Sequence, residues 1–277
     1  MPRVAAESGE DGAVGRPGLL AVTIRSRSEL DDLRRRLGTQ GTLLLEKLNR
    51  RDLRHMRSQV ELAVPESPYD IDAYSPFPPE LPQLADIPKA ILVALRIQAF
   101  GAFERGRLVR WGPVSSGGRH HQTPAGLYHT NWRSRRKVST INAHWIMPWY
   151  FNLHTSMGVA FHEYAIPGLP ESYGCIRLVG EDARWIFSWA DRWIPARRPG
   201  GPPRAFGTPV IVFGAYDYDS PPPWQHLALN LGAADVDLSA LDRVVGRYLP
   251  VLRQRAADRL SLEESLQKDA TTQSESN

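Results

Sequence analysis

The sequence predicts a mainly β protein that also contains helices, an α+β fold. Short apolar stretches that alternate with polar residues run through the middle of the chain, and this period of two is typical of half-buried strands. Residues 181–193 instead repeat their apolar side chains at the i, i+3, i+4, i+7 spacing of an amphipathic helix. A second helical pattern covers residues 239–259.

Residues 18–66 form the first predicted unit, which has the order strand, helix, helix, strand. Apolar residues alternate at the start of this unit and again from Val60. Between the two strands, Ser28 can cap a first helix that Gly38 can end, and a second short helix follows. The preceding residues, 1–17, are small and polar and are interpreted as a flexible tail.

The chain beyond this unit divides by composition. Residues 67–88 hold six prolines, and we interpret them as a linker or a strap laid over a surface. The turn at residues 104–107 predicts a β-hairpin within the main domain, residues 89–216. The basic run 133–137 is interpreted as a solvated loop, and residues 217–277 as a proline-rich bridge, a helix and a disordered end. Further strands are predicted at 126–132, 146–151, 158–162 and 209–213.

The composition excludes several classes of function. The chain has 277 residues, a formal net charge of +4 and one cysteine, which excludes an internal disulfide and a multi-cysteine zinc module. No stretch reaches the ~18 apolar residues that span a bilayer, so we expect no transmembrane segment. The histidines lack the spacing of a metalloprotease, and the basic run is too short to indicate a nucleic-acid surface. We therefore expect no metal, no cofactor and no nucleic acid.

The first residues do not resemble a secretory signal, because a basic start followed by an apolar core is missing. From the sequence alone, either the protein stays inside the cell or a signal sequence has been removed.

The only cysteine, Cys175, follows a loop rich in proline and glycine and is expected on a turn beside a strand. His162 ends an alternating strand and could return to the same place, where an imidazole is the usual activator of a thiol. Gly174 allows a tight turn whose N–H groups could converge on an oxyanion. In an extended segment, Arg177 would lie on the same side as the thiol and could face a carboxylate. The alternative is a buried core thiol.

His162 and the segment Ser172-Tyr-Gly-Cys-Ile-Arg-Leu178 resemble the active-site signature of the L,D-transpeptidases with a YkuD-type catalytic domain. In that family, a histidine precedes a Ser/Thr-His-Gly-Cys segment that ends in Arg or Asn. The resemblance covers residues 89–216 and implies a YkuD-like β-sandwich. The supporting stretches match in order: 111–117, 123–126, 182–184 and 207–210.

The resemblance implies a role for each matching residue. Cys175 would be the nucleophile that forms a thioester, and His162 would be the base that deprotonates it. A main-chain carbonyl at Tyr173 or its neighbour would orient the base. Backbone N–H groups of Gly174 and Cys175 would stabilise the oxyanion, and Arg177 would anchor the peptide stem or brace the loop.

Further residues are expected at the substrate. Ser172 lies within the motif, and Trp149 and Tyr150 belong to an aromatic group, with Trp132 and Trp145, that could form a wall of the site or part of the core.

The motif departs from the family pattern in two places. Tyr173 stands where the family has a histidine; a backbone role survives this change, and a side-chain role is left open. Residues 163–171 form a shorter interval than is common, which predicts a trimmed loop over the cleft and an altered substrate choice.

The unit at 18–66 resembles a degenerate LysM module, most closely in Leu37-Gly38, Leu48-Asn-Arg50 and Leu62-Ala-Val-Pro65. LysM modules bind glycans that contain N-acetylglucosamine, such as peptidoglycan. The alternative is a small structural cap packed on the catalytic domain.

Together the resemblances imply an enzyme of the cell envelope or periplasm whose partners are peptidoglycan stem peptides and glycan. Its Cys175 thioester with a stem tetrapeptide would release D-alanine and pass the acyl group to an amine, giving a 3→3 cross-link or attaching a protein. Carbapenem-type β-lactams would acylate the same thiol. Two alternatives remain open: an L,D-carboxypeptidase or hydrolase that uses the same acyl-enzyme, and a non-catalytic peptidoglycan-binding scaffold.

Overall fold

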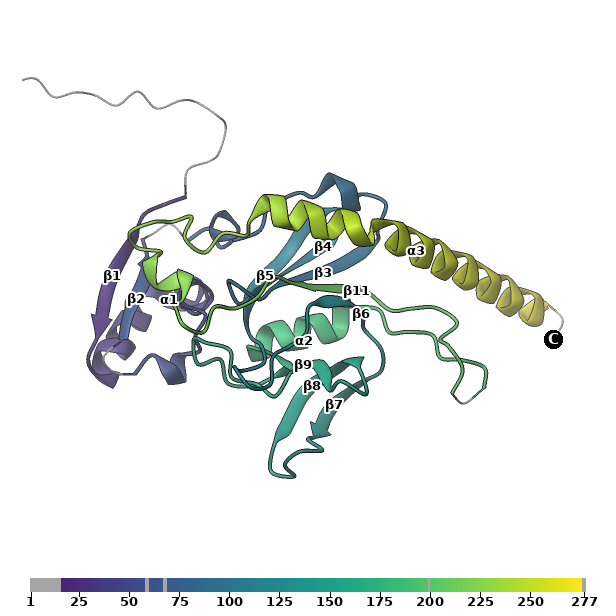
Figure 1. The fold of residues 1–277 in the computed structure, drawn as a ribbon, viewed down its shortest axis with the longest axis horizontal. Coiled ribbons are helices and arrows are strands. Elements are labelled where there is room, and N and C mark those ends of the chain that lie inside the picture. The colour runs from purple at the N-terminus through teal and green to yellow at the C-terminus, as the bar shows by residue number, and fades with distance from the viewer. Residues whose placement is uncertain (1–15, 58–59, 67–68, 199, 276–277) are drawn as a thin grey trace, which may run out of the picture.

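The computed structural model describes residues 16–57, 60–66, 69–198 and 200–275. A curled nine-stranded sheet forms the main body, and a two-stranded sheet lies at one end of the molecule (Figure 1). Most of the predicted tail, residues 1–15, lies outside the described part. In chain order the elements are β1 (Leu19–Ile24), α1 (Arg27–Asn49), β2 (Val60–Pro65), β3 (Lys89–Ala94), β4 (Ala99–Glu104), β5 (Arg107–Ser115), β6 (Gly126–His129), β7 (Arg133–Val138), β8 (Ile146–His154), β9 (Val159–Glu163), β10 (Ile176–Leu178), α2 (Gly180–Trp189), β11 (Pro209–Phe213) and α3 (Leu238–Glu275).

The N-terminal unit has the predicted order strand, helix, helix, strand, with β1 antiparallel to β2. α1 is two helices joined at a kink, because Gly38 has φ 63°, in the left-handed region that glycine occupies without strain. The expected cap at Ser28 is wrong. The helix begins two residues earlier, where the Ser26 side chain accepts a hydrogen bond from the Glu29 N–H.

The main sheet has the strand order β6-β11-β3-β4-β5-β10-β9-β8-β7. Central strand β3 is buried on both faces: Leu92 faces one apolar cluster and Val93 the other. The predicted hairpin between β4 and β5 is confirmed, and Arg105 and Gly106 both adopt the positive φ values of its tight turn.

The prediction of a mainly β fold with helices is confirmed. β5 pairs with β4 on one side and with β10 on the other, so the two layers of the expected sandwich are two ends of one continuous sheet. Both ends contribute side chains to a single apolar cluster, which α2 closes with Ala183 and Ile186.

Two segments differ from expectation. The basic run at 133–137 was expected to be a loop, yet it forms edge strand β7 and pairs with β8; cross-strand hydrogen bonds outweigh its weak strand propensity. The expected disordered end is instead the second half of α3, which runs through Glu275 and projects beyond the sheet (Figure 1). Among the described residues, no helix is long and apolar enough to cross a membrane.

The N-terminal unit shares its core with the main body. Leu44 and Leu48 of α1 lie in the same buried cluster as Leu81 and Trp111. Lys47, also on α1, is buried and lies 3.7 Å from the Asp182 carboxylate of α2. These contacts fit the structural cap that the sequence left open as the alternative to a LysM module.

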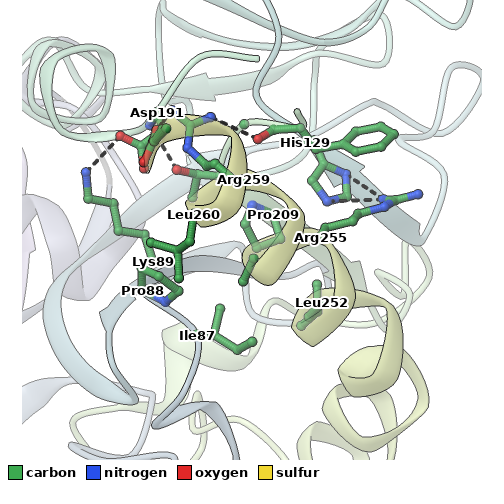
Figure 2. Close-up of a pocket in the computed structure, with 15 residues that line it drawn as sticks. Ile87, Pro88, Lys89, His129, Asp191, Pro209, Leu252, Arg255, Arg259 and Leu260 are labelled. Atoms are coloured by element: carbon green, nitrogen blue, oxygen red, sulfur yellow. Dashed lines mark hydrogen bonds and ion pairs between the residues drawn. The ribbon is translucent and has the colours of Figure 1, made fainter. Parts of the chain in front are cut away.

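A small cavity of about 140 Å³ lies where α3 crosses the edge of the sheet (Figure 2). Its charged groups are satisfied within the protein: Lys89 pairs with Asp191 at 3.1 Å, and Arg259 donates to the carbonyl oxygens of Arg192 and Phe206. We interpret this cavity as the seam that docks α3 on the sheet.

His129 lies in the same seam, with Arg255 Nη1 3.1 Å from its ring nitrogens (Figure 2). Burial, with a smaller contribution from Arg255, lowers the pKa of His129 to about 3. Below pH 6.5, His129 therefore binds a proton in the unfolded chain but stays neutral in the folded chain. This difference removes about 2 kcal/mol of stability at pH 5 and nothing above pH 7.

We expect the His129→Phe variant to lose less of its melting temperature than the wild type when the pH falls from 7 to 5. The difference should be a few °C, since ~1 kcal/mol corresponds to about 2–4 °C in a domain of this size. Calorimetry of both proteins at several pH values measures it, and equal losses would contradict the assignment of a neutral buried imidazole.

Candidate active site

A cavity with a volume of about 420 Å³ lies between the β7–β8 hairpin and the ends of β9 and β10, next to the motif residues. It brings together six of the eight residues predicted for the site. Its lining residues are Trp132, Lys137, Ser139, Thr140, Ile141, Trp145, Met147, Tyr150, Asn152, Thr155, Ser156, Met157, Gly158, His162, Tyr164, Ser172, Tyr173, Cys175 and Arg177.

Two parallel strands set the relative positions of the thiol and the imidazole. Phe161 of β9 is opposite Ile176 of β10, and both side chains are buried in the core. Because side chains alternate along a strand, His162 and Arg177, which form the next pair in register, point to the other face with Cys175. The predicted grouping of these three side chains is therefore what the strand register produces.

The Cys175 thiol is held in a neutral form. Sγ donates a hydrogen bond to the carbonyl oxygen of Gly158 at 3.1 Å. Burial raises the pKa of Cys175 to about 11, although a hydrogen bond from the Ala160 backbone and the charge of Arg177 act in the opposite direction. A thiol with this pKa needs a base to become a nucleophile at neutral pH.

The His162 imidazole is also neutral and has a fixed orientation. Its Nδ1 lies 2.9 Å from the carbonyl oxygen of Glu163, so Nδ1 carries the proton and Nε2 is free to accept one. Burial lowers the pKa of His162 to about 4, and the charge of Arg177 adds to this effect. The expectation that a carbonyl at Tyr173 or its neighbour orients the base is wrong, since the carbonyl of the next residue in β9 does so.

The turn before the thiol is tightly anchored. Gly174 has φ 98°, a conformation that favours glycine, and its carbonyl accepts a hydrogen bond from Thr123 Oγ1 at 2.9 Å. Ser172, expected at the substrate, is buried and donates from Oγ to the Cys175 carbonyl at 2.5 Å. Its backbone N–H donates to Ser116 of the neighbouring loop. Ser172 thus lines the cavity mainly as a brace of the turn.

Tyr173 presents its side chain to the cavity mouth and is 48% exposed. Its ring stacks on His121, with centroids 4.4 Å apart, and lies 5.3 Å from the Trp145 ring. The ring that replaces the family's histidine is therefore part of an aromatic rim.

Arg177 lines the cavity with its charge already paired. Nη1 lies 2.9 Å from a carboxylate oxygen of Glu171, and the guanidinium stacks over the Tyr164 ring at 4.8 Å. The resemblance implied that Arg177 either anchors the peptide stem or braces the loop, and these contacts fit bracing of the loop.

Tyr150 and Trp149 lie on opposite faces of β8. Tyr150 lines the cavity, and its hydroxyl accepts a hydrogen bond from Asn152 Nδ2 at 3.3 Å. Trp149 instead packs against Phe187 and Arg184 of α2 and does not line the cavity, which is the core position that the sequence left open as the alternative. Adjacent residues of a strand cannot both face one cavity, and the sequence already contained that signal.

Lys137 was not predicted at the site. It lines the cavity from β7, the strand interpreted as a loop, and the basic composition of that stretch carried no signal of its place in the sheet. Within the described ranges, no carboxylate forms an ion pair with Lys137, and no three side chains of the metal-ligating types gather at one point.

A thiol and a neutral imidazole on adjacent strands, above an anchored glycine turn, define a site able to perform nucleophilic acyl transfer. Residues 88–212 match the family of the YkuD L,D-transpeptidase catalytic domain. This part of the chain is therefore similar to a YkuD-type L,D-transpeptidase catalytic domain.

Several solved structures are similar to this chain. An L,D-transpeptidase from Stackebrandtia nassauensis is 21% identical, with 46% of this chain and 56% of that chain covered and a TM-score of 0.38. One from Xylanimonas cellulosilytica is 21% identical, with 74% and 100% covered and a TM-score of 0.42. An L,D-transpeptidase solved in complex with imipenem is 19% identical, with 56% and 74% covered and a TM-score of 0.34. The chain thus spans little more than half the length of the Stackebrandtia protein, and no curated protein matches it.

Proposed function

We propose that this protein is a cysteine-dependent peptidoglycan L,D-transpeptidase of the cell envelope. The observation that carries the proposal is the placement of Cys175 and His162 by adjacent strands on one cavity, within a domain of the YkuD family. The donor is a stem tetrapeptide, and the acceptor is an amine of a second stem or of a protein.

The first step begins with rotation of the thiol. Sγ leaves the Gly158 carbonyl and donates to Nε2 of His162, which takes the proton as sulfur attacks the carbonyl carbon of the third donor residue. The resulting tetrahedral oxyanion lies against the backbone N–H groups of Gly174 and Cys175. Collapse breaks the C–N bond to D-alanine, whose nitrogen takes the proton from the imidazolium, and leaves a thioester on Cys175.

The second step resolves the thioester. An acceptor amine attacks the acyl carbon, His162 takes one proton from the amine, and the C–S bond breaks to restore the thiol. The product carries a 3→3 cross-link or an attached protein. A carbapenem enters the same sequence at the first step, when its ring amide is opened by the thiol and a stable thioester remains.

Water could resolve the same thioester and would make the protein an L,D-carboxypeptidase. Product analysis separates the two outcomes: a purified tetrapeptide donor is incubated with and without an amine acceptor. Cross-linked product that forms with the acceptor supports the transpeptidase. Tripeptide alone under both conditions supports hydrolysis, and binding to sacculi without release of D-alanine supports a scaffold.

The charge of the cavity predicts which donors it takes. Lys137 faces the cavity without an ion-pair partner among the described residues, whereas Arg177 is neutralised by Glu171. We expect Lys137 to bind a donor carboxylate, and the Lys137→Met variant to raise KM about 5–10-fold for a donor with a free terminal carboxylate, the cost of one charge-assisted hydrogen bond.

A donor with an amidated C-terminus checks this assignment, because its KM should differ little between wild type and variant. The Arg136→Gln variant is the matched control, since Arg136 is an exposed cation on the same strand that does not line the cavity. An equal rise of KM for both donors would contradict the assignment.

A further inference from the structure

The segment that joins the base to the nucleophile, residues 164–171, contacts the N-terminal unit. The contact is made by residues 51 and 52, which follow α1. From its sequence, the N-terminal unit is expected to be a glycan-binding module or a structural cap, and neither role gives it a part in the active site.

Asp52 makes a reciprocal pair of hydrogen bonds with the segment. Its backbone N–H donates to the Ile166 carbonyl at 2.9 Å, and the Ile166 N–H donates to Asp52 Oδ2 at 2.9 Å. Both residues are buried, since Asp52 is 7% exposed and Ile166 is fully enclosed. A carboxylate that accepts a backbone N–H out of water is among the stronger hydrogen bonds of a protein.

The same carboxylate is fixed from its other side. Oδ1 accepts the backbone N–H of Arg54 at 3.0 Å and lies 2.7 Å from Nδ1 of His55. Burial acts to raise the pKa of Asp52, but hydrogen bonds from Ile166 and His55 outweigh it and leave the pKa below its usual value. Asp52 is therefore a charged group held rigidly against the segment.

Arg51 adds a second contact. Its backbone forms an isolated bridge with Pro167, and its guanidinium lies against Gly168 so closely that a Cβ there would fall 2.6 Å from Nε. Gly168 has φ 92°, which other residues rarely adopt. The backbone of the segment is thus shaped to receive residues 51 and 52.

The two ends of the segment carry the groups of the site. At the first end, the Glu163 carbonyl holds Nδ1 of His162, and Tyr164 stacks with Arg177. At the second end, directly before the turn with Cys175, the backbone N–H groups of Glu171 and Ser172 donate hydrogen bonds to the Ser116 carbonyl. In the middle of the segment, Ser115 Oγ of β5 donates to the Leu169 carbonyl at 2.8 Å, and Asp52 holds the stretch before it through Ile166.

We propose that Asp52 is a positioning residue of the active site, which holds the segment between His162 and Cys175 through its hydrogen bond with Ile166. The N-terminal unit thus helps to position the catalytic residues of the neighbouring domain. This inference rests on the proposed function, because it is measured through acylation of Cys175.

Two substitutions of Asp52 separate this role from its role in local folding. In the Asp52→Ser variant, the hydroxyl can still cap the turn by accepting the Arg54 N–H. The serine side chain is one bond shorter than that of aspartate, so its oxygen cannot reach the Ile166 N–H. The Asp52→Asn variant keeps an oxygen at the full reach for Ile166. We expect the serine variant to acylate about tenfold more slowly, and the asparagine variant to stay within threefold of wild type.

The experiment measures acylation of the full chain by imipenem, with the maximal rate constant and the half-saturating concentration determined separately. Lost positioning lowers the rate constant and leaves the half-saturating concentration within about twofold. The Asp70→Ala variant is the control, since it removes a carboxylate that caps an exposed turn away from the segment.

Acylation of the serine variant at the wild-type rate would overturn the inference. So would an equal loss in the Asp70→Ala variant, because the effect would then follow general stability. A wild-type protein that is never acylated would instead overturn the proposed function, so the two failures are distinguishable.

Discussion

Replacement of Cys175 by alanine is expected to abolish turnover and the imipenem adduct together. The variant lacks the sulfur that forms the acyl-enzyme, and no other cysteine exists in the chain to take its place. Loss of a covalent nucleophile removes on the order of 10⁴-fold or more of the rate. Release of D-alanine from a tetrapeptide and intact-protein mass spectrometry measure the two losses.

The melting temperature supplies the control for this variant. Alanine removes the hydrogen bonds of the sulfur with the backbone of Gly158 and Ala160, so the folded state should persist within a few °C of wild type. A folded alanine variant that still releases D-alanine would show that the nucleophile lies elsewhere.

Replacement of His162 by glutamine is expected to lower acylation at pH 7 by about 10²–10⁴-fold, the usual contribution of a positioned general base. Glutamine fills a similar volume at this buried position but cannot take the proton. The matched control is His144→Gln, an exposed histidine of the β7–β8 hairpin that should acylate like wild type.

The pH dependence of the same two proteins gives a sharper test. With the pKa of His162 at about 4 and that of Cys175 at about 11, both groups are neutral at pH 7. Wild-type acylation should therefore be level from pH 6 to 9 and fall as the pH drops through 4, where the base becomes protonated. The glutamine variant depends on free thiolate, so its rate should rise about tenfold per pH unit toward pH 11. A wild-type profile with a midpoint near 7 would instead indicate a thiolate–imidazolium pair.

Local signals in the sequence located the fold and the centre of the site. The hairpin was predicted from the turn sequence at residues 104–107, and Arg105 and Gly106 adopt the positive φ values that such a turn requires. His162 and Cys175 were predicted from their local sequence together with the resemblance of residues 172–178 to the L,D-transpeptidase signature, and the strand register brings both to one face.

Features that depend on tertiary contacts could not be predicted. β7 is a basic edge strand whose pairing with β8 outweighs its composition, and with it Lys137 was missed. The carbonyl that orients His162 depends on the ring rotamer at the end of β9. The bond between Asp52 and Ile166 joins residues 114 positions apart, and no periodicity records such a contact.

The N-terminal unit shows the same limit. Its strand and helix order was readable, but its buried contacts with Trp111 and with the segment 164–171 were not. These contacts fit a cap that supports the catalytic site; glycan binding of the LysM type stays a prediction.

The most direct test of the central claim is intact-protein mass spectrometry of the wild-type chain, quenched in acid shortly after mixing with a stem tetrapeptide. We expect a mass increase equal to the mass of the donor less that of one free D-alanine molecule, which carries away the thiol proton, and we expect it on the peptide that contains Cys175. A folded protein that shows no adduct, or the same adduct in the Cys175→Ala variant, would contradict it.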